Sequence, residues 1–208
     1  MQSTTNTTFL PIAPDQPVFI LRFLQDPLAN TIAVIVLFIM ITSVIITAYL
    51  FLKIPLKTPP SFPPWLIPAL AICGLFIAGY LSYVELSQSN AICGPVGDCN
   101  AVQRSPYARL WGILPIGVIG VAGYFVIIGL WLFYYFGPKS RKGFIVQILW
   151  GTVLLGTLFS SYLTFLEPFV IGATCAWCVT TALVMTFLLW LTIALVIRED
   201  QTNIQPIT

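Results

Sequence analysis

Four cysteines in two closely spaced pairs are the residues of this chain with the clearest capacity for chemistry. The first pair is Cys93 and Cys99, within the segment CGPVGDC, and the second is the Cys-x-x-Cys motif of Cys175 and Cys178. Such pairs either exchange disulfides with other thiols or form permanent crosslinks. The chain contains no histidine, so imidazole is excluded from every catalytic or metal-binding proposal.

The Cys-x-x-Cys pair stands at a predicted helix start. Thr174 is a suitable N-cap residue, which predicts a helix beginning at or next to Cys175. The unpaired amides and the dipole at such a terminus stabilise a thiolate and lower its pKa. Cysteines three apart share one helix face, and Cys178 would lie about 4.5 Å deeper along the axis. We expect Cys175 to meet water and the loop, and Cys178 to meet the protein interior.

The other pair lies in a predicted loop. Gly94, Pro95 and Gly97 prevent a regular helix between Cys93 and Cys99, so these cysteines could move and attack a disulfide. The run 100–109 is amphiphilic enough for a short helix at a membrane surface. The fifth cysteine, Cys73, falls inside an apolar stretch and is expected to be a small apolar core residue.

Two structural interpretations of the four cysteines compete with disulfide exchange. Both pairs could form permanent disulfides in a non-catalytic membrane scaffold. They could also bind zinc through four thiolates, but Cys-x5-Cys is not a common partner for Cys-x2-Cys, and an oxidising compartment disfavours such a site. We therefore expect no metal.

The composition defines the elements that must position these cysteines. Hydrophobic residues make up 58% of the 208 residues, charged residues only 8%, and the mean hydropathy is +0.95. The net charge of +2 gives no reason to expect a nucleic-acid partner. A helix needs about 20 apolar residues to cross a bilayer, and backbone in lipid must be helical unless it closes a barrel. Five stretches qualify: 31–52, 66–86, 111–136, 144–166 and 176–197. The prediction is an all-α membrane protein.

Small residues predict how these spans pack. Gly74 with Ala78, and Gly156 with Ser160, form small-xxx-small pairs, and a stripe of glycines follows the third span at 117, 120 and 123. The first span contains no glycine and is expected at the periphery. We therefore predict a four-helix bundle at 66–197 with one additional N-terminal transmembrane helix at 31–53.

The positions of Lys and Arg predict the orientation of the spans. Six should share one side, namely Lys53, Lys57, Lys139, Arg141, Lys142 and Arg198, and three the other, namely Arg22, Arg104 and Arg109. Cytoplasmic loops carry the excess of positive charge. This places segment 1–30 outside the cytoplasm and tail 198–208 within it. Connections 87–110 and 167–175 are then both extracytoplasmic, where disulfides can form.

These residues together resemble the vitamin K epoxide reductase family. The resemblance rests on the ordered set of Cys93 and Cys99, Ser105 six positions later, Trp111-Gly112 opening a span, and Cys175-x-x-Cys178 followed by Val-Thr-Thr-Ala. It implies a four-helix bundle around a quinone. It also implies electron flow from a thioredoxin-like partner to Cys93/Cys99, then to Cys175/Cys178, and then to the quinone.

The resemblance also implies individual roles. Cys93 would meet the partner, Cys99 would exchange with Cys175, and Cys178 would face the quinone. Ser105 would lie near the quinone, although a helix cap is its simpler interpretation. Tyr107, Trp111 and Trp177 are expected as aromatic anchors at the membrane interface, with quinone contact as the second interpretation. Glu85 and Glu167 stand at span boundaries, and we expect both in water at helix ends.

The expected function is that of a membrane thiol:quinone oxidoreductase that supports disulfide formation. Its acceptor would be a quinone of the ubiquinone, menaquinone or phylloquinone type, in a bacterial or archaeal cell membrane. Many bacterial relatives append a thioredoxin-like domain, but this chain ends soon after Arg198, so we expect a separate thioredoxin-like (DsbA-like) protein. Ala182 stands where the vertebrate enzymes carry tyrosine, which argues against the alternative of vitamin K epoxide reduction.

Overall fold

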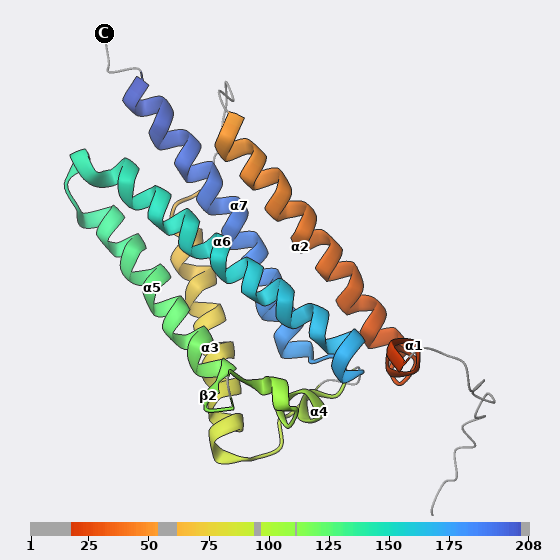
Figure 1. Ribbon diagram of the computed structural model, residues 1–208. Coiled ribbons are helices and arrows are strands. Elements are labelled where there is room, and N and C mark those ends of the chain that lie inside the picture. Colours follow the sequence, from red (N-terminus) through yellow and green to blue (C-terminus); the bar gives the residue numbers. More distant parts are fainter. Residues whose placement is uncertain (1–17, 54–61, 94–96, 111, 205–208) are drawn as a thin grey trace, which may run out of the picture.

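The computed structural model describes residues 18–53, 62–93, 97–110 and 112–204, and it consists almost entirely of helices (Figure 1). Among these residues, five helices are long and apolar enough to cross a membrane. They are α2 (Pro27–Lys53), α3 (Leu66–Ser87), α5 (Ile116–Phe136), α6 (Lys142–Leu166) and α7 (Ala176–Ile204). The prediction of an all-α membrane protein with a four-helix core and an N-terminal helix is confirmed.

Most of the shorter elements gather at one end of the bundle (Figure 1). They are α1 (Val18–Phe23), α4 (Cys99–Gln103), the 3-10 turn η1 (Pro106–Ala108), strands β1 (Arg109–Leu110) and β2 (Leu114–Pro115), and the π-helical turn η3 (Glu167–Ile171). The 3-10 turn η2 (Lys139–Arg141) joins α5 to α6 at the other end.

The third span is shorter than predicted. It begins at Ile116 rather than at 111, because β1 and β2 pair antiparallel directly before it, with Leu110 opposite Leu114. Gly112 has a φ of +73° in the connecting turn, a conformation that glycine adopts without strain. The predicted surface helix over 100–109 is replaced by α4 and η1.

The fourth span runs further than predicted. After α6 the chain continues through η3, so the helical path extends beyond 166 to Ile171. Pro168 lacks a backbone N–H group and cannot continue a regular α-helical ladder. Gly172, with a φ of +83°, ends the turn by donating its N–H to the Glu167 carbonyl at 2.8 Å. The wider π turn is the reason that Glu167 does not continue the surface of α6.

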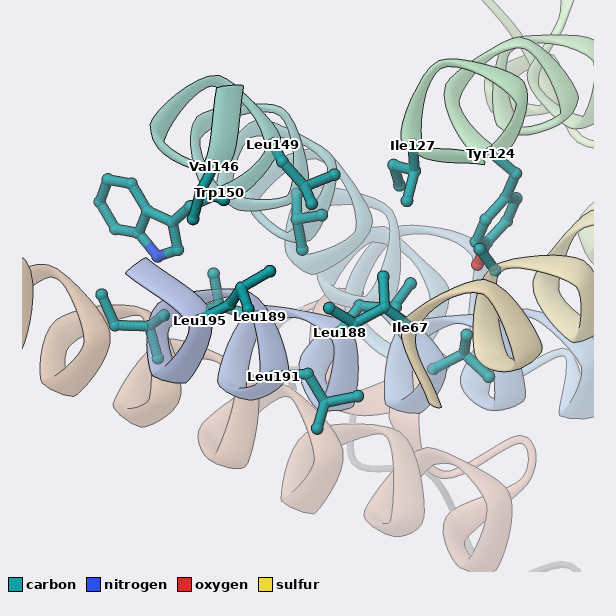
Figure 2. Packing of buried hydrophobic residues seen from close by; sticks show 14 of the residues in the cluster. Ile67, Tyr124, Ile127, Val146, Leu149, Trp150, Leu188, Leu189, Leu191 and Leu195 are labelled. Atoms are coloured by element: carbon teal, nitrogen blue, oxygen red, sulfur yellow. The ribbon is translucent and has the colours of Figure 1, made fainter. Parts of the chain in front are cut away.

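The main apolar core lies between α3, α5, α6 and α7 (Figure 2). Leu149 of α6 and Leu188 and Leu189 of α7 are fully buried there. Tyr124 and Ile127 bring α5 into the same cluster. Four helices therefore share one core, which leaves the outward faces to the lipid.

Small residues bring these helices close together. A Cβ atom added to Gly74 would lie 2.2 Å from the Tyr124 ring, and one added to Gly156 would lie 2.2 Å from the end of Met185. These two glycines therefore lie at close contacts of α3 with α5 and of α6 with α7. Gly123 differs, because a Cβ there would meet nothing within 4 Å. Cys73 was expected in the core and instead lies exposed on the outside of α3.

Helix α2 lies along the outside of the four-helix core, against α6 and α7 (Figure 1). One face of α2 is buried, with Ala33 and Met40 at 0% exposure, while Phe38 on the other face is 72% exposed. Trp190 of α7 donates its indole N–H to the Ser43 hydroxyl at 3.1 Å. The first span is therefore peripheral in position and firmly packed along one side.

Candidate active site

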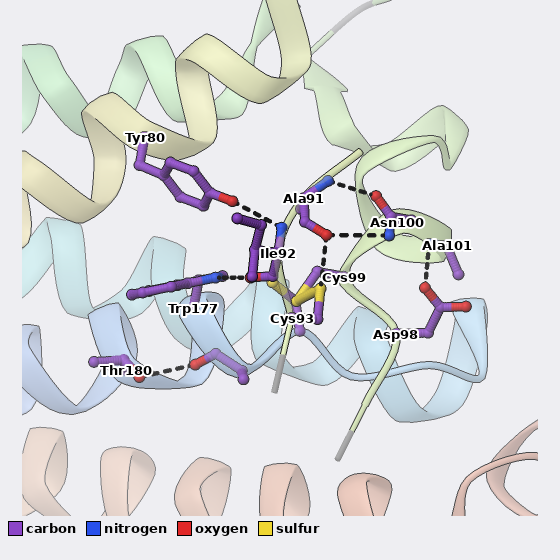
Figure 3. Close-up of a disulfide and its surroundings, with 12 residues drawn as sticks. Tyr80, Ala91, Ile92, Cys93, Asp98, Cys99, Asn100, Ala101, Trp177 and Thr180 are labelled. Atoms are coloured by element: carbon purple, nitrogen blue, oxygen red, sulfur yellow. Dashed lines mark hydrogen bonds between the residues drawn. A yellow bond between two sulfur atoms is a disulfide. The ribbon is translucent and has the colours of Figure 1, made fainter. Parts of the chain in front are cut away.

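Both cysteine pairs lie at the same end of the bundle, within one cluster of buried residues. Cys93 and Cys99 form a disulfide, and Cys175 and Cys178 carry free thiols (Figure 3). Cys99 and Cys175 are both 0% exposed, whereas Cys93 and Cys178 are half-buried. Cys99 of the loop and Cys175 of the Cys-x-x-Cys motif therefore both lie in the buried centre of this cluster.

The segments on both sides of the disulfide are held by side chains. Asp98 accepts the Ala101 N–H at 3.0 Å and so caps α4, which places Cys99 at the first residue of that helix. The Asn100 side chain accepts the Ala91 N–H at 2.7 Å and donates to its carbonyl at 3.4 Å (Figure 3). This pairing fixes the chain shortly before Cys93 against the chain that follows Cys99.

Trp177, inside the Cys-x-x-Cys motif, also holds the first cysteine pair. Its indole N–H donates to the Ile92 carbonyl at 2.9 Å, and the Ile92 N–H donates to the Tyr80 hydroxyl at 2.8 Å (Figure 3). The rings of Tyr80 and Trp177 contact each other with centroids 5.4 Å apart. Trp177 thus links the Cys-x-x-Cys motif to Ile92, the residue before Cys93. The sequence predicted Trp177 only as an aromatic anchor at the membrane interface or as a quinone contact.

Thr174 joins the two cysteine segments. Its carbonyl accepts the Asp98 N–H at 3.0 Å. Gly97 makes this approach possible, because it has a φ of +88° and a Cβ there would lie 2.3 Å from the Thr174 carbonyl oxygen. The Thr174 hydroxyl donates to the Asn30 side chain at 2.9 Å, so its predicted role as a side-chain N-cap is wrong. The helix itself does begin next to Cys175, at Ala176.

Asn30 extends this contact to α2. It is 0% exposed, and its amide group donates to the carbonyls of Phe23 at 2.9 Å and Gly172 at 3.3 Å. Arg22 of α1 donates to the carbonyl of Val170 in the neighbouring turn. The N-terminal helices therefore bind the segment that leads into Cys175.

Glu167 takes the position at the start of α7 that was predicted for Thr174. Its carboxylate accepts the Cys175 N–H at 3.2 Å and hydrogen-bonds the Cys178 thiol. Glu167 is 2% exposed and Glu85 is 4% exposed, so the expectation that both lie in water is wrong. The physical reason for Glu167 is the π turn, which points the side chain inward between α6 and α7.

Cys175 was expected to meet water, and this expectation is also wrong. It is 0% exposed and lies in the cluster of buried residues that also contains Ile77, Leu81 and Cys99. A hydrogen bond from the Cys178 thiol, together with the backbone N–H groups of Trp177 and Cys178, holds the pKa of Cys175 below its ordinary value despite burial. This is the lowering predicted for a thiol at a helix N-terminus.

Cys178 lines a cavity of about 380 Å³ between α3, α5, α6 and α7. Most of the wall is apolar, with Leu81, Ile116, Leu155, Phe159 and Leu163 among the lining residues. The volume is within the usual range of small-molecule sites, which is about 300–1,000 Å³. A flat, largely apolar ring such as a quinone fits this lining, because only a few polar groups need hydrogen-bond partners.

The polar groups of the cavity include two of the predicted quinone contacts. Ser105 and Tyr107 both line the cavity, while Trp111 lies outside the described residues. The Ser105 hydroxyl donates to the Val102 carbonyl at 2.7 Å, at the end of α4, and does not cap the following turn. Glu85 and Glu167 also line the cavity.

Two residues of this site were missed from the sequence, Glu167 and Asn30. Glu167 carried a usable signal, because a carboxylate followed by proline at the end of an apolar span is costly to bury and tends to be functional. Asn30 had a weaker signal, since a polar residue at the start of a span is common at a membrane interface. Two of its three partners, Gly172 and Thr174, are 142 and 144 residues away, and no local pattern indicates them.

Comparison with known proteins agrees with this geometry. No curated protein matches the chain. A sequence model of the Vitamin K epoxide reductase family matches residues 65–193, which is more than half of the chain. The matched range begins after α2 and includes all four paired cysteines. The chain therefore belongs to the vitamin K epoxide reductase family of membrane oxidoreductases.

Proposed function

We propose that this protein is a thiol:quinone oxidoreductase that reoxidises a separate thioredoxin-like protein and so supports disulfide formation. Its catalytic unit would be residues 66–197. The acceptor would be a quinone of the ubiquinone, menaquinone or phylloquinone type. The observation that carries the proposal is the position of Cys178. This residue lines the apolar cavity and also contacts the thiol of Cys175, the other cysteine of its motif.

The burial of the cysteines supports an order of exchange. Cys93 is half-buried and Cys99 is fully buried, so a soluble donor would reach Cys93 first. A donor thiolate attacks Cys93, Cys99 leaves as a thiolate, and the second donor thiol then releases the oxidised donor. Cys93 and Cys99 are left reduced, and the donor has lost two electrons and two protons.

The second exchange moves the same electrons inward. Cys99 attacks Cys175 in the oxidised Cys175–Cys178 pair, and Cys93 completes the exchange. The disulfide returns to Cys93–Cys99, and two thiols remain at Cys175 and Cys178. These thiols give two electrons to the quinone, whose two oxygens end as hydroxyl groups, and the Cys175–Cys178 disulfide forms again. Strongly oxidising dithiol proteins are kept oxidised by quinones in this manner.

The proposed orientation puts the cysteine end outside the cytoplasm, in a bacterial or archaeal cell membrane. Three arginines, Arg22, Arg104 and Arg109, lie at or near this end of the described structure. Five basic residues of the described structure lie at the opposite end: Lys53 at the end of α2, Lys139 and Arg141 in η2, Lys142 at the start of α6, and Arg198 in α7. The excess of positive charge at that end supports a cytoplasmic location for it.

The test uses purified protein in detergent, a reduced thioredoxin-like donor and a water-soluble ubiquinone analogue. We expect quinone reduction by the intact protein and its loss in Cys178→Ser. Cys73→Ser is the matched control, because Cys73 is exposed on the outside of α3 and should be dispensable. Cys99→Ala, given the oxidised donor instead and quenched with acid, should be trapped as a mixed disulfide, because Cys93 attacks the donor disulfide and one donor cysteine leaves as a thiolate. No reduction by the intact protein, or full activity in Cys178→Ser, would refute the proposal.

The same assay separates the alternatives. Vitamin K epoxide replaces the quinone in a parallel reaction, and we expect the quinone to be the better acceptor. Ala182, where the vertebrate enzymes carry tyrosine, is buried against Val36 and Met40 of α2. A non-catalytic scaffold would instead leave all four cysteines equally inert to alkylation after mild reduction and would trap no donor.

A further inference from the structure

Glu167 is a carboxylate buried at the point where the thiols meet the cavity. It is 2% exposed and lies in the π turn between α6 and α7. It accepts the Cys175 backbone N–H at 3.2 Å, and the Cys178 thiol lies within its reach, so that the single S–H proton can be donated to Glu167 or to Cys175. It also lines the cavity that Cys178 lines. One carboxylate therefore contacts both cysteines of the pair and the space beside them.

A capping role alone does not explain a carboxylate at this position. Neutral side chains such as Ser, Thr and Asn satisfy a helix N-terminus equally well. A buried carboxylate costs much more free energy than a neutral cap unless its charge is compensated. Ionisable residues at membrane depth commonly mark proton relays. The contact with the Cys178 thiol gives this carboxylate a proton to exchange.

We propose that Glu167 is the catalytic base and acid of the Cys175–Cys178 pair, an inference that rests on the proposed function. Glu167 takes the proton of the Cys178 thiol as that sulfur gives up its electrons, and then gives it to a quinone oxygen. The S–H bond of Cys178 breaks and the Cys175–Cys178 bond forms. The Cys175 proton is released to water, and water supplies the proton for the second quinone oxygen. Two electrons and two protons are thus balanced.

The charged groups on the elements around η3 have other partners. The packed elements are α1, α2, α4 and α6. Their charged side chains near this turn are bound to groups other than the Glu167 carboxylate. Arg22 donates to the Val170 carbonyl, Asp26 and Asp98 accept backbone N–H groups at the starts of their own helices, and Arg104 donates to Asn90.

Glu85, the other carboxylate of the cavity wall, lies 3.8 Å from Arg109. Within the described residues, the groups that act directly on Glu167 are therefore the Cys175 backbone N–H and the two thiols.

The kinetic test follows one turnover of reduced protein mixed with the ubiquinone analogue. Glu167→Gln keeps an acceptor for the Cys175 N–H but cannot take a proton. We expect its rate to fall by about 10²–10⁴-fold, with the half-saturating quinone concentration unchanged within about threefold. The wild-type rate should vary little around neutral pH. The Gln variant should instead speed up about tenfold per pH unit, because the thiol must lose its proton to water.

Two further variants make the test specific. Glu167→Asp retains a carboxylate and should recover part of the rate together with the wild-type pH profile. Glu199→Gln is the matched control, since Glu199 accepts the Tyr134 hydroxyl at 2.7 Å near the far end of α7 and should leave the rate unchanged. A Glu167→Gln protein with the wild-type rate and pH profile would overturn the assignment.

An infrared measurement tests the contact without any quinone. In reduced protein, the S–H stretching band of Cys178, identified by its loss in Cys178→Ala, should lie at low frequency because a carboxylate accepts its hydrogen bond. In Glu167→Gln the band should move upward. An unshifted band in wild-type protein overturns the proposal even if the Gln variant fails to fold. Absence of quinone reduction by wild-type protein with a shifted band would instead overturn the proposed function.

Discussion

The contact between α2 and the segment before Cys175 leads to a quantitative prediction for Asn30→Ala. The variant loses bonds of 2.9 Å to Phe23, 3.3 Å to Gly172 and 2.9 Å from Thr174, all at a fully buried position. A hydrogen bond contributes about 0.5–1.5 kcal/mol net, or about 0.6 kcal/mol on average between membrane helices. We therefore expect a loss of about 2–3 kcal/mol, including the unpaired Thr174 hydroxyl.

The consequence for function is a less well-defined position of Cys175. If about 1.4 kcal/mol of the loss falls on the geometry needed for exchange, the rate between Cys99 and Cys175 falls about tenfold. Unfolding in mixed detergent micelles measures the stability, and acid quenching with mass spectrometry of alkylated cysteines measures the exchange.

The matched control for this prediction lies on the same helix. Thr42→Ala removes an exposed hydroxyl that bonds only to its own helix, at the Phe38 carbonyl at 2.8 Å, and should change neither measurement. If Asn30→Ala unfolds and exchanges like Thr42→Ala, then α2 does not position Cys175 and this reasoning is refuted.

Two further predictions concern helix packing and the outer thiol. Gly74→Ala should destabilise the bundle by about 1–3 kcal/mol, because its Cβ would lie 2.2 Å from the Tyr124 ring, whereas Gly79→Ala, with nothing within 4 Å, should stabilise α3 by about 0.5–1 kcal/mol. Similar unfolding midpoints for the two variants would contradict this. In reduced protein the pKa of Cys175 is lowered, so its thiolate should persist below the ordinary midpoint of about pH 8.5. The ultraviolet absorbance of the thiolate against pH, taken as the difference from Cys175→Ser, should show this without reagent access to the buried sulfur. Cys178→Ala, which removes the largest cause, should move the midpoint upward, and equal midpoints would contradict the stated cause.

Much of the fold was predictable because crossing a membrane is a constraint along the chain. Five apolar stretches of sufficient length predict five helices, and two crossings separate the cysteine segments, which returns them to the same end. The errors at the ends of spans have local causes. Gly112 allowed β1 and β2 to pair before α5, and Pro168 widened the last turn of α6 into η3.

The sequence by itself determined the class of protein and the chemistry available to it. Apolar length, the absence of histidine and the spacing of Cys93, Cys99, Cys175 and Cys178 are properties of the chain, and they hold however the helices pack. The tertiary structure decided how that chemistry is controlled. The burial of Cys175, the contact of Glu167 with Cys178 and the bond from Thr174 to Asn30 all depend on how separate helices meet. Hydrogen bonds and burial act between neighbours in space, and sequence patterns report only neighbours along one helix or turn.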